Sequence, residues 1–155
     1  MSPPGALRYR RDLVDGLVPP HWPAGFRHRT LQSADAPEIH SLLTRAFDGN
    51  VADFDSWWSS LSGDPEFAAD LCFLVHDRDG KLVGVAQCWT GNYLKDLAVV
   101  PEERRLGIGE CLLRHVFATF CARGAASVDL KVDADNSTAI RLYERAGMRR
   151  IPIEG

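Results

Sequence analysis

A strand-like segment, a glycine-containing loop and a helical segment follow one another between residues 93 and 124, and this succession constrains the fold most. The segment "YLKDLAVV" (93–100) is mainly apolar and ends at Pro101. The loop "ERRLGIGE" (103–110) comes next, and "ECLLRHVFATFCAR" then repeats apolar residues at helical spacing until Gly124. Because one apolar stripe on a helix has to be buried, this helix is expected to pack on a sheet that contains residues 93–100.

Hydrophobic periodicity predicts further elements on both sides of this unit. The predicted strands cover residues 26–32, 71–76, 81–89 and 127–133, with a last short strand in "MRRIPI" (148–153). Three predicted helices begin near residues 35, 54 and 136, and Asp35 with Glu38 resembles a capping box. The order of elements predicts a mixed α/β (α+β) fold with helices flanking a sheet.

The chain of 155 residues has the size of one ordinary domain. Residues 1–25 are rich in proline and glycine and are expected to form an extended lead-in, while residues 26–155 form a single domain. The start has no signal-peptide pattern and no apolar run long enough to span a bilayer. The four cysteines lack metal-ligand spacing, so no metal is expected, and buried free thiols fit a soluble protein of the reducing cytoplasm.

Charge is distributed unevenly along the chain. The formal net charge of −3 argues against general nucleic-acid binding. Residues 31–100 hold eleven acidic and four basic residues, a local net charge of about −7. This acidic stretch is either ordinary solvated surface or a field that attracts a cationic ligand.

The glycine loop before the long helix has the features of an anion site. Exposed backbone N–H groups and the positive end of the helix dipole point at the same place. Glycine at 107 and 109 removes the Cβ atoms from the path of an approaching phosphate. An ordinary strand-to-helix turn would look similar, and two nucleotide motifs do not fit: Leu112 replaces the third glycine of the dinucleotide fingerprint, and "GEC" replaces the G-K-[ST] of a P-loop.

At this point the sequence resembles the GNAT superfamily of N-acetyltransferases. "VVPEERRLGIGECLL" is similar to the family signature R/Q-x-x-G-x-G/A, matched at Arg104, Gly107 and Gly109. "DLKVDADNSTAIRLYERAGM" is similar to the family's second motif. Its matching positions are Asn136, Ala139, Leu142, Tyr143, Glu144 and Gly147. The resemblance is specific from Tyr93 to Met148 and implies a GNAT-like mixed, centrally splayed β-sheet with, in this chain, a shortened C-terminal end.

The resemblance implies acetyl-CoA as co-substrate. Backbone N–H groups from Arg105 to Glu110 would hold the pyrophosphate, most specifically at Leu106, Gly107, Ile108 and Gly109, and Arg104 would support the loop. The strand edge at Leu97, Ala98 and Val99 would pair with the pantetheine arm. This requires residues 94–100 and 127–133 to splay apart.

The resemblance also suggests catalytic roles. Tyr143 corresponds to a general acid that protonates the leaving thiolate, although a core aromatic residue would occupy the same position. The backbone N–H near Leu97 would stabilise the oxyanion. Asn136 either contacts the cofactor or simply caps the last helix.

The general base is the open question at this stage. The positions where relatives carry a glutamate correspond to Tyr93 or Lys95. Asp96 is the remaining acid of that strand, and alternation places it on the other face unless a bulge intervenes. Asp96 as base, a structural Asp96, a base acting through water and no dedicated base all stay open.

The acceptor is expected to be a primary amine, either a small cationic amine or a peptide or protein amino group. Trp57, Trp58 and Trp89 lie in the acidic region and are either an aromatic wall for a cation or core residues. Relatives usually end in two strands, whereas this chain has one candidate, so an exposed sheet edge is expected. A partner subunit or the N-terminal segment would cover it, which makes a homodimer possible.

Three functions therefore compete. The leading one is an N-acetyltransferase that works by direct attack of the amine in a ternary complex. The second is a domain that binds acyl-CoA as a sensor or scaffold without turnover. The third is an interaction module that uses the open sheet edge and does not bind acetyl-CoA.

Overall fold

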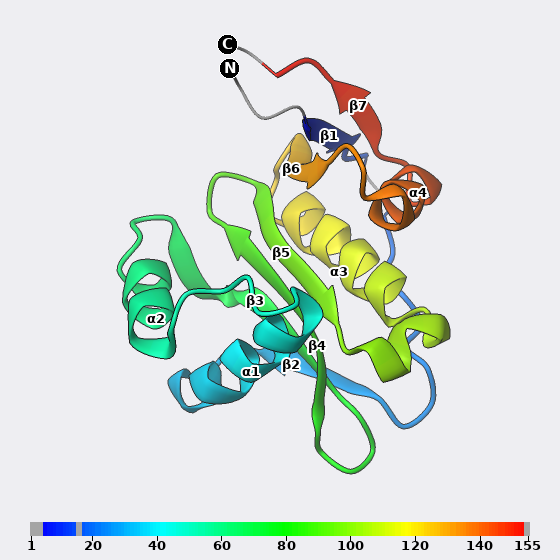
Figure 1. Ribbon diagram of the computed structural model, residues 1–155. Helices are drawn as coiled ribbons and strands as arrows, with labels where there is room; N and C mark the ends of the chain where they lie inside the picture. The colour runs from blue at the N-terminus through cyan, green and yellow to red at the C-terminus, as the bar shows by residue number, and fades with distance from the viewer. Residues whose placement is uncertain (1–4, 15–16, 154–155) are drawn as a thin grey trace.

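The computed structural model describes residues 5–14 and 17–153, and within them seven strands form one sheet with helices on both faces (Figure 1). The strands are β1 (Ala6–Asp12), β2 (Arg27–Thr30), β3 (Phe67–His76), β4 (Leu82–Trp89), β5 (Tyr93–Val99), β6 (Ser127–Asp133) and β7 (Arg149–Ile151). The helices are α1 (Ala36–Ala46), α2 (Phe54–Ser62), α3 (Ile108–Ala122) and α4 (Ser137–Arg145), with short 3-10 turns η1 (Ser33–Asp35) and η2 (Pro101–Leu106).

The sheet has the order β2-β3-β4-β5-β6-β1-β7. All neighbouring strands are antiparallel except β5 and β6, which are parallel and share one ladder pair, Tyr93 with Asp129. Beyond this pair the two strands diverge, as the predicted central splay requires. The mixed α/β fold and the splayed sheet are therefore confirmed.

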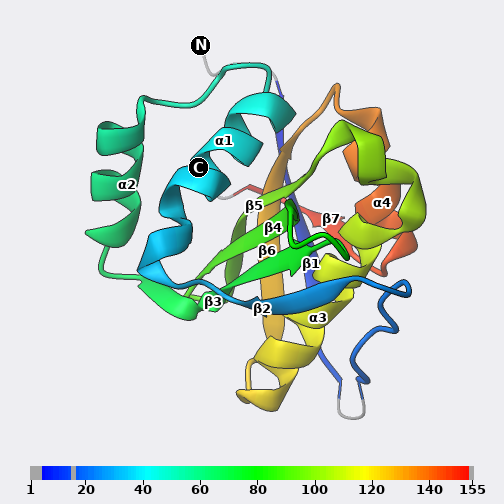
Figure 2. The same cartoon turned by 90° about the horizontal axis from the view of Figure 1, so that it is seen from below.

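Helices cover the two faces of the sheet in pairs. Figure 2 shows α1 and α2 on one side of the sheet and α3 and α4 on the other. Strand β4 is buried along all its length except its last residue, because α1 and α3 contact it from opposite sides. On α3 the predicted apolar stripe is buried and includes Ile108, Leu112 and Val116.

The segment of residues 1–25, predicted as an extended lead-in, contains a strand at residues 6–12 that the sequence did not predict. These residues form β1, which lies between β6 and β7 and is antiparallel to both. Tyr9 is 3% exposed, and its hydroxyl donates a hydrogen bond to Glu144 Oε2 at 3.0 Å. The segment "ALRYRRD" holds four charged residues in seven, so it does not show the apolar pattern of a strand. A strand with one face open to solvent tolerates such charges on that face.

A missing last strand was expected to leave a sheet edge that a partner subunit or the N-terminal segment would cover. In the structure the N-terminal segment supplies β1, which lies between β6 and β7. The two edge strands of the described sheet, β2 and β7, are four and three residues long and rich in arginine. Short, charged edges of this kind disfavour pairing with another chain.

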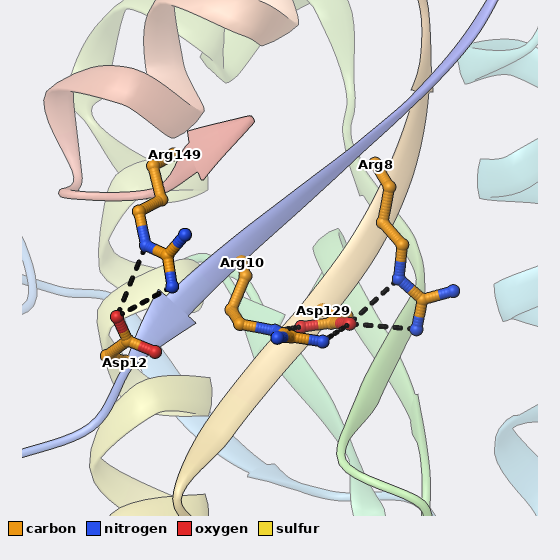
Figure 3. Close-up of polar contacts among 5 residues, drawn as sticks. All are labelled: Arg8, Arg10, Asp12, Asp129 and Arg149. Atoms are coloured by element: carbon orange, nitrogen blue, oxygen red, sulfur yellow. Dashed lines mark hydrogen bonds and ion pairs between the residues drawn. The ribbon is translucent and has the colours of Figure 1, made fainter. Parts of the chain in front are cut away.

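Ion pairs join β1 to its neighbours (Figure 3). Asp129 on β6 is 5% exposed and accepts hydrogen bonds from Arg8 Nε at 2.8 Å and from Arg10 Nε at 2.7 Å. Burial acts to raise the pKa of Asp129, but the bonds from Arg10 and Arg8 outweigh it and lower that pKa. Arg149 on β7 contacts Asp12 at 3.1 Å, and this second pair is exposed. Both pairs hold the register of β1.

Two predicted details differ in the structure. The capping box at the first helix is wrong: Asp35 makes no side-chain cap to α1, and Glu38 instead accepts a hydrogen bond from the Leu82 backbone N–H at 3.1 Å. The four cysteines are free, but Cys111 and Cys121 are only half-buried. No helix in the part of the chain that the structure describes is long and apolar enough to cross a bilayer.

Candidate active site

The glycine loop connects the end of β5 to the first turn of α3. Gly107 has a φ of +80°, in the left-handed region that favours glycine, and a Cβ added there would meet no atom within 4 Å. The space over this position is therefore open. The first N–H groups of a helix have no intrahelical acceptor, so the start of α3 presents donors beside this open position.

Gly109 has a different role in the same loop. A Cβ at Gly109 would lie 3.6 Å from Leu142 Cδ2 and 3.8 Å from Val99 Cγ2, which are ordinary contacts. The first turn of α3 thus lies beside β5 and α4, with room for a methyl group at this position. Ile108, between the two glycines, is fully buried and anchors the loop, whereas Leu106 is 51% exposed.

Charged side chains hold this loop in place. Arg104 Nε donates a hydrogen bond to the Val99 backbone oxygen at 3.1 Å, and the side chain of Arg105 lies outside what the structure describes. Glu110 contacts Arg145 of α4 at 3.0 Å and Arg114 at 3.1 Å, and these bonds lower the pKa of Glu110. Arg104 and Glu110 therefore join the loop to β5 and to α4.

The splay between β5 and β6 opens next to this loop. Leu97, Ala98 and Val99 lie beyond the single β5–β6 pair, so their backbone at the β6 side is outside that ladder. Ala98 and Val99 are buried by the helices on the two faces. The predicted cofactor-binding strand edge and glycine loop are thus parts of one continuous feature.

Tyr143 and Asp96 reach the same region from opposite sides of the splay. Tyr143 lies on α4 and is 9% exposed. Burial, and secondarily the negative charge of Asp96, raise the pKa of Tyr143 to about 12. The phenol is therefore neutral, with its proton available as a donor, throughout the physiological pH range.

Asn136 is the N-cap of α4. Its Oδ1 accepts a hydrogen bond from the Ala139 backbone N–H at 3.2 Å. The capping interpretation of this residue is present in the structure, and the cofactor contact stays a prediction.

A β-bulge decides where Asp96 points. Gln87 pairs with Asp96 and Cys88 pairs with Leu94, so Lys95 is an extra residue on β5. The bulge that sequence alternation left open is therefore present. Asp96 pairs across β4 with Gln87 and then with Cys72 on β3, which places the three side chains in one row on one face. Lys95 Nζ contacts Asp96 Oδ2 at 2.8 Å.

Sequence analysis missed Gln87. The residue is 3% exposed in a strand of otherwise apolar or small residues, "LVGVAQCW". One polar side chain inside such a strand was the available signal, because buried polar groups are uncommon and often functional.

The tryptophans of the acidic region act mainly in packing. Trp57 is 8% exposed and its ring centroid lies 5.8 Å from that of Trp58. Trp58 also contacts Phe67 edge to face at 6.0 Å. Asp53 accepts a hydrogen bond from the Ser56 backbone N–H at 3.4 Å as the N-cap of α2. The cation-binding role of this region stays a prediction.

The acetyltransferase (GNAT) family model matches residues 36–148, which include the loop, the splay and α4. The chain belongs to this family. Acetyl-CoA is the general acetyl donor of the family. The described residues fit that donor at the open glycine position and at the unpaired edge of β5.

The chain is also similar in sequence to individual acetyltransferases. It is 30% identical over 145 residues to a mycothiol acetyltransferase of Clavibacter michiganensis subsp. michiganensis, covering 90% of this chain and 47% of that protein. It is 40% identical over 60 residues to the [ribosomal protein bS18]-alanine N-acetyltransferase of Escherichia coli K12, covering 39% of this chain and 40% of that protein. The chain spans about half the length of the mycothiol acetyltransferases that it matches.

A solved structure shares the fold over nearly the whole chain. The GCN5-related N-acetyltransferase from Sphaerobacter thermophilus superposes with a TM-score of 0.78 at 29% identity, covering 95% of this chain and 48% of that one. That coverage includes the N-terminal region that the family model does not match.

Proposed function

We propose that this chain transfers an acetyl group from acetyl-CoA to a primary amine, by direct attack of the amine in a ternary complex. The observation that carries the proposal is the joining of three parts: the open glycine loop, the splayed edge of β5, and Tyr143 with Asp96 across the splay. The pyrophosphate would bind the N–H groups at the start of α3. The pantetheine arm would pair with residues 97–99.

Direct attack is favoured over an acyl-cysteine intermediate. Burial raises the pKa of Cys72 to about 12 and that of Cys88 well above its usual value. Burial also raises the pKa of Cys111. A thiol is nucleophilic as its thiolate, so these three residues are protonated and unreactive at neutral pH.

The Leu97 backbone N–H and Tyr143 would act at different steps of the reaction. The Leu97 backbone N–H would stabilise the oxyanion formed when the amine attacks the thioester. Tyr143 would donate its proton toward the departing sulfur as the C–S bond breaks. A phenol with a pKa near 12 is a weaker acid than a thiol with a pKa of about 8.5. Tyr143 would therefore act mainly by donating a hydrogen bond to the developing thiolate, and full transfer of its proton would come late in the step.

The acceptor class is a small cationic amine or a peptide or protein amino group. The acidic stretch of residues 31–100 supports a cationic acceptor through its field. The names of the relatives include both a small-molecule and a protein acetyltransferase. The acceptor panel should therefore contain aminoglycosides, polyamines, amino acids and short peptides with an alanine amino end.

The test is mass spectrometry after incubation of the full chain with acetyl-CoA and this panel. Enzyme-dependent gain of one acetyl group, lost in Tyr143→Phe, supports the proposal and names the acceptor class. Stabilisation of the protein by acetyl-CoA without any product would instead favour the acyl-CoA-binding sensor. That alternative drew support from the unassigned general base and from an expected missing strand; β1 supplies a strand between β6 and β7.

A further inference from the structure

Gln87 carries a buried hydrogen-bond acceptor that the fold itself does not use. Its Nε2 donates to the Cys88 backbone oxygen at 2.9 Å. Its Oε1 is buried, and among the described residues no donor lies within hydrogen-bond distance of that oxygen. Leaving such an acceptor unsatisfied lowers the stability of the fold. An unsatisfied acceptor in the middle of an apolar strand indicates that Gln87 has a role beyond the stability of the fold.

The position of Gln87 relates this oxygen to the proposed chemistry. Gln87 is the direct cross-strand partner of Asp96, and such partners have Cβ atoms about 4.5–5.5 Å apart. Asp96 lies on β5, between Gln87 on β4 and the splay toward β6. Its negative charge also helps to raise the pKa of Tyr143 and of Cys72. The acceptor oxygen and the carboxylate thus face the same side of the sheet.

We propose that Gln87 is a positioning residue for proton removal from the acceptor amine: its Oε1 accepts the hydrogen bond of the carboxylic acid that Asp96 becomes when it takes the amine's proton. The inference rests on the proposed acetyl transfer. In the resting protein Gln87 and Asp96 are direct cross-strand partners, Asp96 is paired with Lys95, and Gln87 Oε1 has no donor among the described residues. Protonation of Asp96 supplies the missing donor.

Each proton released in the proposed reaction has an acceptor. An ammonium group loses two protons when it becomes an amide N–H. The first goes to Asp96, whose O–H then bonds to Gln87 Oε1, and the freed nitrogen lone pair attacks the thioester carbon. When the C–S bond breaks, the sulfur takes a proton from Tyr143. The second nitrogen proton restores Tyr143, and Asp96 releases the first to solvent.

The groups around this pair come from several elements. Lys95 contacts Asp96 from the bulge, Cys72 lies beyond Gln87 on β3, and Tyr93 and Tyr143 approach from β5 and α4. Burial raises the pKa of Cys72 and of Tyr143 to about 12, and it also raises the pKa of the half-buried Tyr93. Cys72 and Tyr143 therefore add no change of charge near Gln87 as an assay moves from pH 7 to 9.5.

A purely structural role for Gln87 would depend on a different atom of its side chain. The Nε2 bond to Cys88 lies beside the bulge, and a residue kept only for that bond needs its amide N–H and not its oxygen. Gln87→Glu keeps a carboxyl oxygen as acceptor and removes the amide donor. Gln87→Met keeps the length of the side chain and removes both functions.

The experiment measures kcat and KM for the panel amine that gives the most product, at pH 7 and pH 9.5, with acetyl-CoA affinity and thermal unfolding in parallel. We expect Gln87→Met to lower kcat/KM for the amine about tenfold at pH 7, with unchanged acetyl-CoA affinity. The deficit should shrink at pH 9.5, because more of a lysine-like amine with a pKa of about 10.4 is then already neutral. Gln87→Glu should stay within about threefold of the wild type.

Three outcomes would overturn the inference. These are wild-type turnover in Gln87→Met at pH 7, the same deficit at both pH values, and an equal loss in Gln87→Glu and Gln87→Met. Failure of the proposed function is separate, because the wild-type chain would then form no product with any panel amine. In that case the inference falls with it.

Discussion

Tyr143 is the residue in which sequence motif and structural position agree most closely. Its phenol is nearly buried beside the splay, and its pKa of about 12 keeps it protonated in any ordinary assay. The phenol therefore keeps its proton and can donate a hydrogen bond to the departing sulfur, although it is a weaker acid than an ordinary tyrosine. Gln87 and Asp96, by contrast, gain their proposed roles only from each other's position.

Tyr143→Phe should lower kcat about 100-fold or more, which is the usual contribution of a positioned acid. The KM for acetyl-CoA should change little, because the hydroxyl is proposed to act on the departing sulfur. Steady-state kinetics measure both values. A variant with wild-type kcat would remove Tyr143 from the mechanism. The wild-type rate should also show no decline from Tyr143 ionisation below about pH 11.

His115 supplies a pH-dependent contribution to stability. Its ring packs among other rings, with its centroid 4.8 Å from that of His28 and 4.7 Å from that of Phe73. Burial, and secondarily the charge of His28, lower the pKa of His115 below its usual 6.5. The neutral ring therefore stabilises the fold fully above pH 6.5, and this contribution is lost as the pH falls through the lowered pKa.

We accordingly expect the free energy of unfolding to decrease between pH 7.5 and pH 5.5. The decrease should be smaller in His115→Gln, which has no titrating ring. The carboxyl groups with lowered pKa values, including Asp35 and Asp129, titrate below this window and do not contribute to it. Denaturant unfolding at both pH values measures the effect. Equal pH dependence in variant and wild type would contradict it.

At the scale of elements, two connections shape the site: β1 against β6, and the glycine loop against β5 and α4. The first connection spans more than a hundred residues and depends on a buried carboxylate between two arginines. The second is local in sequence and depends on backbone conformation. Each can be tested by a pair of matched substitutions.

Asp129→Asn should lower the free energy of unfolding by about 1–3 kcal/mol. The substitution leaves Arg8 and Arg10 without their shared counter-charge, and their partial exposure limits the loss. Asp12→Asn is the control, because its pair with Arg149 is exposed and should contribute less than about 1 kcal/mol. Denaturant titration of both variants gives the comparison. Equal effects would mean that the buried pair does not hold β1.

Gly107→Trp should abolish binding of acetyl-CoA. The position is open, so the side chain would occupy the space proposed for the pyrophosphate, and the positive φ adds about 1–2 kcal/mol of strain. Gly109→Ala should keep binding, since its Cβ would make only ordinary contacts. Isothermal titration with acetyl-CoA measures both variants. Tight binding by Gly107→Trp would move the cofactor away from this loop.

At the scale of the whole molecule, β1 closes one end of the sheet. It pairs with β6 on one side and β7 on the other, and it places Tyr9 in the core. The possible homodimer was predicted because a missing last strand was expected to leave a sheet edge exposed. In the structure β1 supplies a strand between β6 and β7, and the homodimer stays a prediction.

Deletion of residues 1–12 should lower the melting temperature by about 10 °C or more. Burial of a large aromatic side chain contributes about 2–3 kcal/mol, and the backbone hydrogen bonds to two strands add to it. In a domain of this size each kcal/mol corresponds to about 2–4 °C. Tyr9→Phe, which removes only the hydroxyl bond to Glu144, should lose about 1 kcal/mol. Scanning calorimetry would contradict the expectation if the deletion melted like the wild type.

The sequence by itself determined the local parts of this protein. The apolar stripe of α3, the glycines of the loop and the cap of α4 are each encoded within one or two turns of chain, where spacing has a direct physical meaning. They were sufficient to predict the βα unit, the helices and the family. The second motif also predicted Tyr143 as a site residue, because it lies within the same short segment.

Only the tertiary structure decided the non-local relations. The pairing of Arg8 and Arg10 with Asp129, the row of Gln87 and Asp96, and the approach of Tyr143 to Asp96 join residues from separate elements. Alternation predicts on which face of a strand a side chain lies, but not which strand lies beside it. The single bulge at Lys95 also shifts the side chains of β5 relative to simple alternation. The physical reason is that strand pairing is fixed by packing over the whole sheet, which no short window of sequence contains.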